Sequence, residues 1–278
     1  MGSRVTFAIG GQEFQVYAPQ YGYTSKIALP FHFQRKLPRG YTSSDDGTDY
    51  DVRSCNLSFM LDATEAERLV SVYRDEDKGR GVQIGMRLHK NSGFTPFGPD
   101  KGDYGNYAVT IYDLTCSGAL RAPWKYFSLQ CSMIGTEFPE VAEPDERTDG
   151  TFQIGTVTGL RFPADFPKPD QNYAVDVSFT RNGTADTVDR LSSSDHYETS
   201  LKMICSRSRA YALVKHLVET VRTNNVNIVA GNGTYLFGVE NGAGGTYTCQ
   251  WIDTELTVAH IGFNRYEIPL KFSLVSVA

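Results

Sequence analysis

The sequence lacks the motifs that mark most enzyme and metal-protein families. It contains no GxSxG, HExxH or P-loop motif, and no glycine-rich dinucleotide fingerprint follows a strand-like run. Its five histidines are scattered, and none has a second histidine at ligand spacing. We therefore expect no catalytic residue, no cofactor and no metal site, and a protein that is not an enzyme.

Segments for export or membrane insertion are also missing. No basic segment followed by an apolar run opens the chain, which predicts no signal peptide. No stretch approaches the ~20 apolar residues of a membrane-spanning helix. The five cysteines form no CxxC pair and lie in strand-like or helix-like runs, which is typical of buried, reduced thiols.

Basic residues are not in excess, since the formal net charge is −5. Proteins that bind DNA specifically concentrate Lys and Arg on one face, so this composition argues against a DNA-gripping surface. A protein that only surrounds DNA has no need of that excess.

What the chain does contain is its own pattern twice. TFAIG begins at Thr6 and TFQIG at Thr151, an offset of 145. CNLSFMLDATEAERLV (55–70) aligns without a gap with TSLKMICSRSRAYALV (199–214), an offset of 144. Five later matches share an offset of 140: Phe97 with Phe237, Gly102 with Gly242, Tyr107 with Tyr247, Asp113 with Asp253, and Tyr126 with Tyr266. This slowly drifting offset predicts two homologous domains, 1–145 and 146–278. The alternative is two unrelated β domains that share turn chemistry.

Each predicted domain is rich in strands and has one helix. Alternation of apolar and polar residues predicts strands, for example in 5–9, in 25–33 with its match 173–180, and in 266–274. The helices are predicted by apolar stripes at Ala66, Leu69, Val70 and Tyr73, and at Ala210, Leu213, Val214, Leu217, Val218 and Val221. Asp62 to Glu65 has the form of a capping box, and Ser206 can cap the second helix. The fold class is therefore α+β and mainly β: two antiparallel sandwich or barrel domains, each with one packed helix.

Candidate interface residues lie in two glycine-rich loops, 92–105 and 231–245. Each loop is either a contact arm that reaches a neighbouring subunit, or an ordinary hairpin loop. The aromatic candidates in these loops are Phe94, Phe97, Tyr104, Tyr235 and Phe237. Arg207 and Arg209 oppose the dipole at the start of the second helix, so they are either solvated, which we favour, or held by a carboxylate of a neighbouring subunit.

This unit resembles the tail-tube fold of bacteriophage tails: a strand-rich sandwich, a helix entered directly from a strand, and two long closing strands. The tandem duplication resembles baseplate hub or adaptor proteins of such tails. The resemblance implies a structural virion protein that assembles in the host cytoplasm. Three chains would form a pseudo-hexameric ring, with the tail tube and baseplate or spike proteins as neighbours. DNA would pass through the ring without specific binding, and Thr110, Tyr112, Gln250 and Asp253 are candidates for the channel wall.

Two other functions fit parts of the pattern. A hexameric distal tail or tail tube subunit belongs to the same class, although duplication favours a trimer. A carbohydrate-binding module is a different class, in which Trp124, Trp251 and tyrosines stack on sugar rings. Both Trp residues lie in strand-like runs, where packing is the commoner role.

Overall fold

The computed structural model of the chain describes sixteen segments. These are residues 3–18, 22–29, 31–35, 41–45, 52–89, 94–102, 104–117, 126–138, 144–165, 169–172, 175–179, 185–190, 196–231, 234–238, 245–262 and 264–277. All strand pairs within them are antiparallel, so the protein is mainly β, as the sequence predicts.

Within the described residues, the first half of the chain contributes nine strands and one helix. The strands are β1 (Ser3–Ile9), β2 (Gln12–Ala18), β3 (Tyr23–Ala28), β4 (Phe31–Arg35), β5 (Tyr41–Asp45), β6 (Val52–Asp62), β7 (Gln83–Leu88), β8 (Gly105–Ser117) and β9 (Tyr126–Glu137). The helix α1 (Ala63–Arg74) follows β6 directly.

The described part of the second half contributes ten strands and one helix. The strands are β10 (Phe152–Ile154), β11 (Val157–Leu160), β12 (Asp170–Asn172), β13 (Val175–Phe179), β14 (Ala185–Arg190), β15 (His196–Ser206), β16 (Asn225–Val229), β17 (Thr246–Trp251), β18 (Glu255–Gly262) and β19 (Arg265–Val277). The helix α2 (Arg207–Lys215) follows β15 directly and continues as a π-helical segment, His216–Val221.

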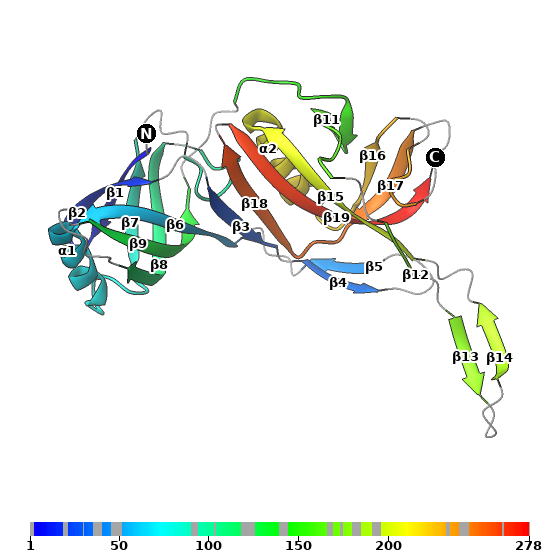
Figure 1. The fold of residues 1–278 in the computed structure, drawn as a ribbon, viewed down its shortest axis with the longest axis horizontal. Helices are drawn as coiled ribbons and strands as arrows, with labels where there is room; N and C mark the ends of the chain where they lie inside the picture. Colours follow the sequence, from blue (N-terminus) through cyan, green and yellow to red (C-terminus); the bar gives the residue numbers. More distant parts are fainter. Residues whose placement is uncertain are drawn as a thin grey trace.

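The two halves have the same strand order. The first half runs β2-β1-β7-β8-β9-β6-β3, and the second runs β11-β10-β16-β17-β19-β15-β12. Each half also places a separate two-stranded hairpin, β4–β5 or β13–β14, between its matched third strand and the strand that feeds the helix. The β13–β14 hairpin projects well away from the rest of the chain (Figure 1).

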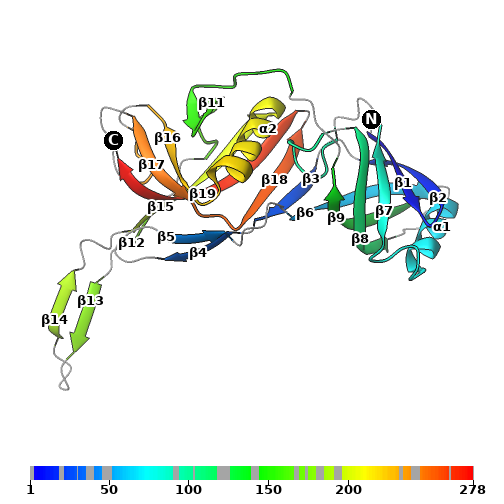
Figure 2. The ribbon, with the colours of Figure 1, turned by 180° about the vertical axis from the view of Figure 1, so that it is seen from behind.

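One sheet runs through both halves because β3 pairs with β18 of the second half. Figure 2 shows β3 and β18 where the two halves of the chain meet. The buried side chains still form two separate clusters, one in each half. Ile27 of β3 and Leu29, which directly follows β3, belong to the cluster of the second half, so the first half helps to build the second core.

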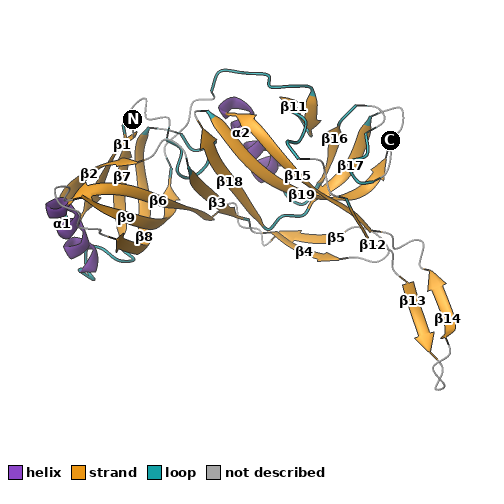
Figure 3. Cartoon of the chain, in the orientation of Figure 1, coloured by secondary structure: helices purple, strands orange, loops and turns teal. Residues whose placement is uncertain are grey.

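The helices lie where their apolar stripes predict (Figure 3). Ala66 and Leu69 of α1 are buried, as are Leu213 and Val214 of α2. Asp62 accepts a hydrogen bond from the backbone N–H of Glu65 at 2.9 Å, so the predicted N-cap forms. Ser206 makes no such side-chain cap. Instead its own N–H donates to the carboxylate of Asp149 at 2.6 Å.

Two predicted strands differ from the observed ones. The matched third strands were expected at 25–33 and 173–180, but the strand equivalent to β3 in the second half is the short β12. Val175–Phe179 instead forms β13 of the projecting hairpin. The long strand expected at 247–258 is interrupted after Trp251, where Asp253 accepts hydrogen bonds from Trp251 Nε1 and from the N–H of Lys271, both at 2.7 Å.

Candidate functional site

The junction between the halves includes the loop 94–102, in which the predicted site residues Phe94 and Phe97 lie. β3 and β18 pair over six positions, from Ala28 opposite Glu255 to Tyr23 opposite His260. On the exposed side, Lys26 Nζ lies 2.9 Å from a carboxylate oxygen of Glu255. On the buried side, Ile27 and Leu256 are fully enclosed.

A polar network lies buried at one end of this junction. The hydroxyl of Tyr23 accepts a hydrogen bond from the N–H of Thr95 at 2.8 Å and lies 2.8 Å from Nδ1 of His260. The hydroxyl of Thr95 is 3.0 Å from that of Tyr266, and the ring of Tyr266 stacks on His260 at 4.5 Å. The network therefore ties the loop 94–102 of the first half to β18 and β19 of the second.

Burial keeps this network uncharged. It lowers the pKa of His260 to about 4, with Arg207 as a further cause, so the imidazole is neutral at physiological pH. Burial, together with Tyr266, raises the pKa of Tyr23 far above its usual value. Neutral groups that hydrogen-bond to one another in this way hold the joined segments in one geometry. They do not supply a charged group for a reaction.

The loop 94–102 is held down by a buried ion pair. Both terminal nitrogens of Arg53 donate to the carboxylate of Asp100 at 2.7 Å, and one also donates to the carbonyl of Phe97 at 2.8 Å. Gly98 has φ of +114°, and a Cβ there would lie 2.8 Å from both the guanidinium and the carboxylate. A glycine is therefore required where the loop passes over the pair.

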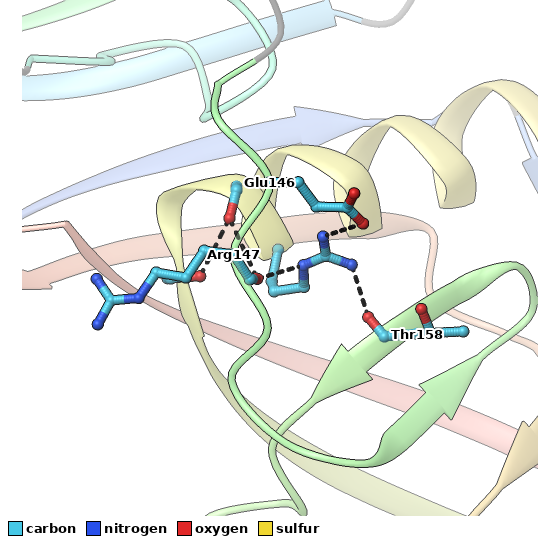
Figure 4. A network of polar contacts seen from close by, with 6 residues as sticks. Glu146, Arg147 and Thr158 are labelled. Atoms are coloured by element: carbon cyan, nitrogen blue, oxygen red, sulfur yellow. Dashed lines mark hydrogen bonds and ion pairs between the residues drawn. The ribbon is translucent and has the colours of Figure 1, made fainter.

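A second network fixes the segment that enters the second half. Arg209 on α2 donates to the carbonyls of Arg147 and Thr158 at 2.7 Å and to the carboxylate of Glu146 at 2.9 Å (Figure 4). Arg209 is only 6% exposed, so these hydrogen bonds take the place of nearly all the contacts that its guanidinium would make with water. The expectation that Arg209 is solvated or held by another subunit is corrected, because its guanidinium is satisfied within the chain.

A groove of about 480 Å³ runs beside this network, along α2. Its lining carries both signs of charge, from Glu146, Lys215 and Glu219. His216 also lines it, within 3.2 Å of the hydroxyl of Thr156, and burial lowers its pKa. Within the described residues, no group of three or more His, Cys, Asp or Glu side chains is arranged to hold a metal ion.

Three of the predicted aromatic anchors lie inside the chain's own cores. Phe94, Phe97 and Phe237 are each fully buried, so they present no side-chain surface to a neighbouring subunit. The loops fold back because a tyrosine holds each one: Tyr107 donates to the carbonyls of Lys101 and Gly102, both at 2.8 Å. Tyr247 in the second half bonds to the carbonyl of Thr234 in the same way. These three residues are therefore corrected from exposed anchors to core residues.

The remaining candidates are on the surface or partly so. Tyr104 and Tyr235 are 53% and 58% exposed, and Arg207 is half-buried. Among the channel candidates Tyr112 is exposed, whereas Gln250 is buried. Trp251 is also fully buried and donates to Asp253, and Trp124 lies outside the described residues.

The residues that build the junction were not recognised in the sequence. Tyr23, His260 and Arg53 each stand alone in their local pattern, and their partners come from distant segments. The only available signal was the run Ser25–Ala28, whose alternation marks a strand without saying which strand it pairs with.

No family model matches the sequence, and a search of curated proteins found no match. In the described part of the chain, neither helix has the length and apolar character needed to cross a membrane.

Proposed function

We propose that the protein is a structural component of a phage tail, a baseplate hub or a tube-to-hub adaptor. It consists of two homologous tail-tube-like domains, 1–145 and 146–278. Three chains form a pseudo-hexameric ring of six domains around a channel through which DNA passes without specific binding. Its neighbours are the tail tube on one side and baseplate or spike proteins on the other.

The observation that carries this proposal is the repeated strand order within one continuous sheet. Seven strands follow the same order in each half, each half places one helix after the equivalent strand, and β3 joins to β18. The buried pairs Phe97–Tyr107 and Phe237–Tyr247 also occupy equivalent loops, with ring centroids 5.8 and 5.3 Å apart. A single duplication would produce all of these similarities at once. In two unrelated domains, each similarity would have had to arise independently.

A change of symmetry along the tail is a reason for two copies of one domain in a single chain. A tube with six-fold symmetry that ends at a trimeric assembly needs a part that presents six similar surfaces from three chains. Two divergent copies in one chain supply this, because each copy can treat its other neighbours differently. The divergence is visible here: the buried Arg53–Asp100 pair belongs to the first half, and position 197, which aligns with Arg53, is Tyr.

The proposal is tested by the solution mass of the purified chain, measured by light scattering, with negative-stain images of the same sample. A trimeric ring with an open centre is the expected result. A hexameric ring would favour the alternative of a distal tail or tail tube subunit. A compact monomer that binds a glycan would overturn the proposal in favour of a carbohydrate-binding module. The burial of Trp251 already removes one of the two tryptophans on which that module depended.

A further inference from the structure

Several strand edges are unpaired in the described part of the chain, including the outer edges of β2 and β11 at the two ends of the sheet. Two further open edges, one in each half, belong to β8 and β12. β7 reaches only as far as Gln83, which lies opposite Thr110 of β8. Beyond Ile111, whose carbonyl accepts from the N–H of Gly81, β8 is paired on its β9 side alone. In the second half, β12 is paired with β15 alone. Open edges are templates for pairing with another strand.

The open edges of β8 and β12 differ from those of β2 and β11, because their counterparts in the other half are occupied inside the chain. β16 ends its pairing with β17 at Gln250, just as β7 ends its pairing with β8 at Thr110. The residues that follow Gln250 form β18, and the edge of β18 is occupied by β3. The strand of the second half that corresponds to β3 is β12, since both lie outside the strand that feeds the helix. The β3–β18 junction therefore joins the counterparts of the two open edges.

The observed registers fix which residues correspond. Lys26 lies opposite Ser54, and Asp170 lies opposite Glu198, so β3 and β12 differ by 144 positions (170 − 26), as do β6 and β15 (198 − 54). The choice of Ser54 and Glu198 as counterparts comes from the sequence alignment of 55–70 with 199–214. The starts of α1 and α2, Ala63 and Arg207, differ by the same 144 positions (207 − 63).

The second correspondence follows from β9 and β19. Cys55 lies opposite Met133, and its match Thr199 lies opposite Phe272, so β9 and β19 differ by 139 positions (272 − 133). Leu114 lies opposite Cys131, which therefore corresponds to Leu270. Continuing the β18–β19 register from the pair Ala259–Glu267 by three residues places Leu256 level with Leu270.

Leu256 thus corresponds to Leu114, an offset of 142 (256 − 114). The flanking residues agree with this assignment, because Asp113-Leu-Thr115 matches Glu255-Leu-Thr257. Leu114 and Leu256 also face equivalent cores, because Leu114 is partly buried against the core cluster of the first half and Leu256 is buried in that of the second.

From these relations we infer that β12 of one chain pairs antiparallel with β8 of a second copy, along residues 113–117. We expect β12 and β8 to pair in the same register as their counterparts β3 and β18. In that register Asp170 lies opposite Thr115, Gln171 opposite Leu114, and Asn172 opposite Asp113. The interface is heterologous, because the second half of one chain meets the first half of the next. Such contacts generate rings when the rotation closes and open filaments when it does not. The inference depends on the duplication proposed above.

The transferred register also predicts how this interface differs from the internal junction. Lys26 and Glu255 form an ion pair across β3 and β18. Lys26 corresponds to Asp170, and Glu255 corresponds to Asp113. The inferred interface therefore has two acidic residues at the positions where the internal junction has an ion pair. The contact between chains is therefore weaker than the contact within the chain, and a charge change at position 170 should strengthen it.

The direct test is disulfide cross-linking of purified full-length protein. In a Cys116→Ser background, Thr115→Cys and Asp170→Cys place two thiols directly opposite one another across the inferred interface. Oxidation should give covalent dimers and larger species on a non-reducing gel. The matched control carries Thr115→Cys with Gln171→Cys, whose side chain leaves the strand on the opposite face and should not cross-link. Cross-linking of the control to the same extent, or none in either protein at any concentration, would overturn the inference.

A charge change supplies a second test that does not depend on oxidation. Asp170→Lys restores the attraction seen between Lys26 and Glu255, so the concentration at half-assembly should fall about three- to tenfold at low salt. Glu76→Lys makes the same charge change on an exposed residue of the first half and should leave assembly unchanged. Equal effects of the two substitutions would show a general response to net charge and contradict the register.

The outcomes separate this inference from the proposed function. Rings in negative-stain images without specific cross-links would support the ring and overturn the β12–β8 pairing. Specific cross-links that extend into open filaments would support the pairing and overturn the closed ring. Cross-linking that stops at a covalent trimer supports both.

Discussion

At the scale of single residues, the strongest constraint is the ion pair between Arg53 and Asp100. The two side chains are 1% and 5% exposed and meet through two hydrogen bonds of 2.7 Å. A buried charge that loses its partner keeps its desolvation cost and has no compensating attraction. We predict that Asp100→Asn lowers the free energy of unfolding by about 3–5 kcal/mol, measured by urea denaturation.

Lys26 and Glu255 provide a matched comparison for this prediction. They form an ion pair of similar length, 2.9 Å, but both side chains are nearly half exposed. Glu255→Gln should therefore change stability little, because water replaces the lost attraction. If Asp100→Asn were as mild as Glu255→Gln, the pair would not stabilise the loop 94–102 as argued here.

The same residues show where interpretation of the sequence failed. Phe94, Phe97 and Phe237 were candidate anchors because the glycine-rich loops that contain them could be contact arms as well as ordinary hairpin loops. Their burial depends on Tyr107 and Tyr247, whose hydroxyls bind loop carbonyls from a neighbouring strand. Periodicity indicates which face of a strand or helix is buried, but an irregular loop has no period, so its direction could not be predicted.

At the scale of elements, the two helices were predictable and their details were not. The apolar stripes and the Asp62 cap are local features, and both are found in the structure. The π-helical segment after Lys215 and the bond from Ser206 to Asp149 depend on contacts with the segment 144–165. Likewise, sequence identity paired Tyr126 with Tyr266, whereas the strand registers equate Tyr266 with Phe127, one residue further on.

The two helix starts make an internally controlled prediction. Asp62→Ala removes a side-chain acceptor from the first turn of α1 and should cost about 1 kcal/mol of unfolding free energy. Ser206→Ala should cost less, because the side chain of Ser206 caps no backbone N–H of α2. Both are measured by urea denaturation of the full chain. An equal or larger loss for Ser206→Ala would mean that its hydroxyl has a role in the helix start that the geometry does not reveal.

At the scale of the whole molecule, the matching residues predicted two similar halves, but nothing in the sequence predicted how the halves are connected. The offsets between matching residues show which segments of the two halves are similar, but they do not show which strand edges pair with each other. The pairing of β3 with β18 joins positions 23–28 to 255–260, and only the folded chain brings these together. The consequence is that the two halves do not separate cleanly, because Ile27 and Leu29 complete the core of the second half.

This arrangement predicts that the chain can be divided but that its parts will stay together. Fragments 1–143 and 144–278, co-expressed with a tag on one of them, should copurify as a one-to-one complex. The strand pairing, the two apolar side chains from the first half, and the contact between Thr95 and Tyr266 all cross the division. Ile27→Asp should abolish copurification, because it places a carboxylate in the core of the second half. Lys26→Ala, one residue away on the exposed side, should preserve it. Fragments that purified apart as folded monomers, or an Ile27→Asp fragment that still bound, would show that β3 is not what holds the two halves together.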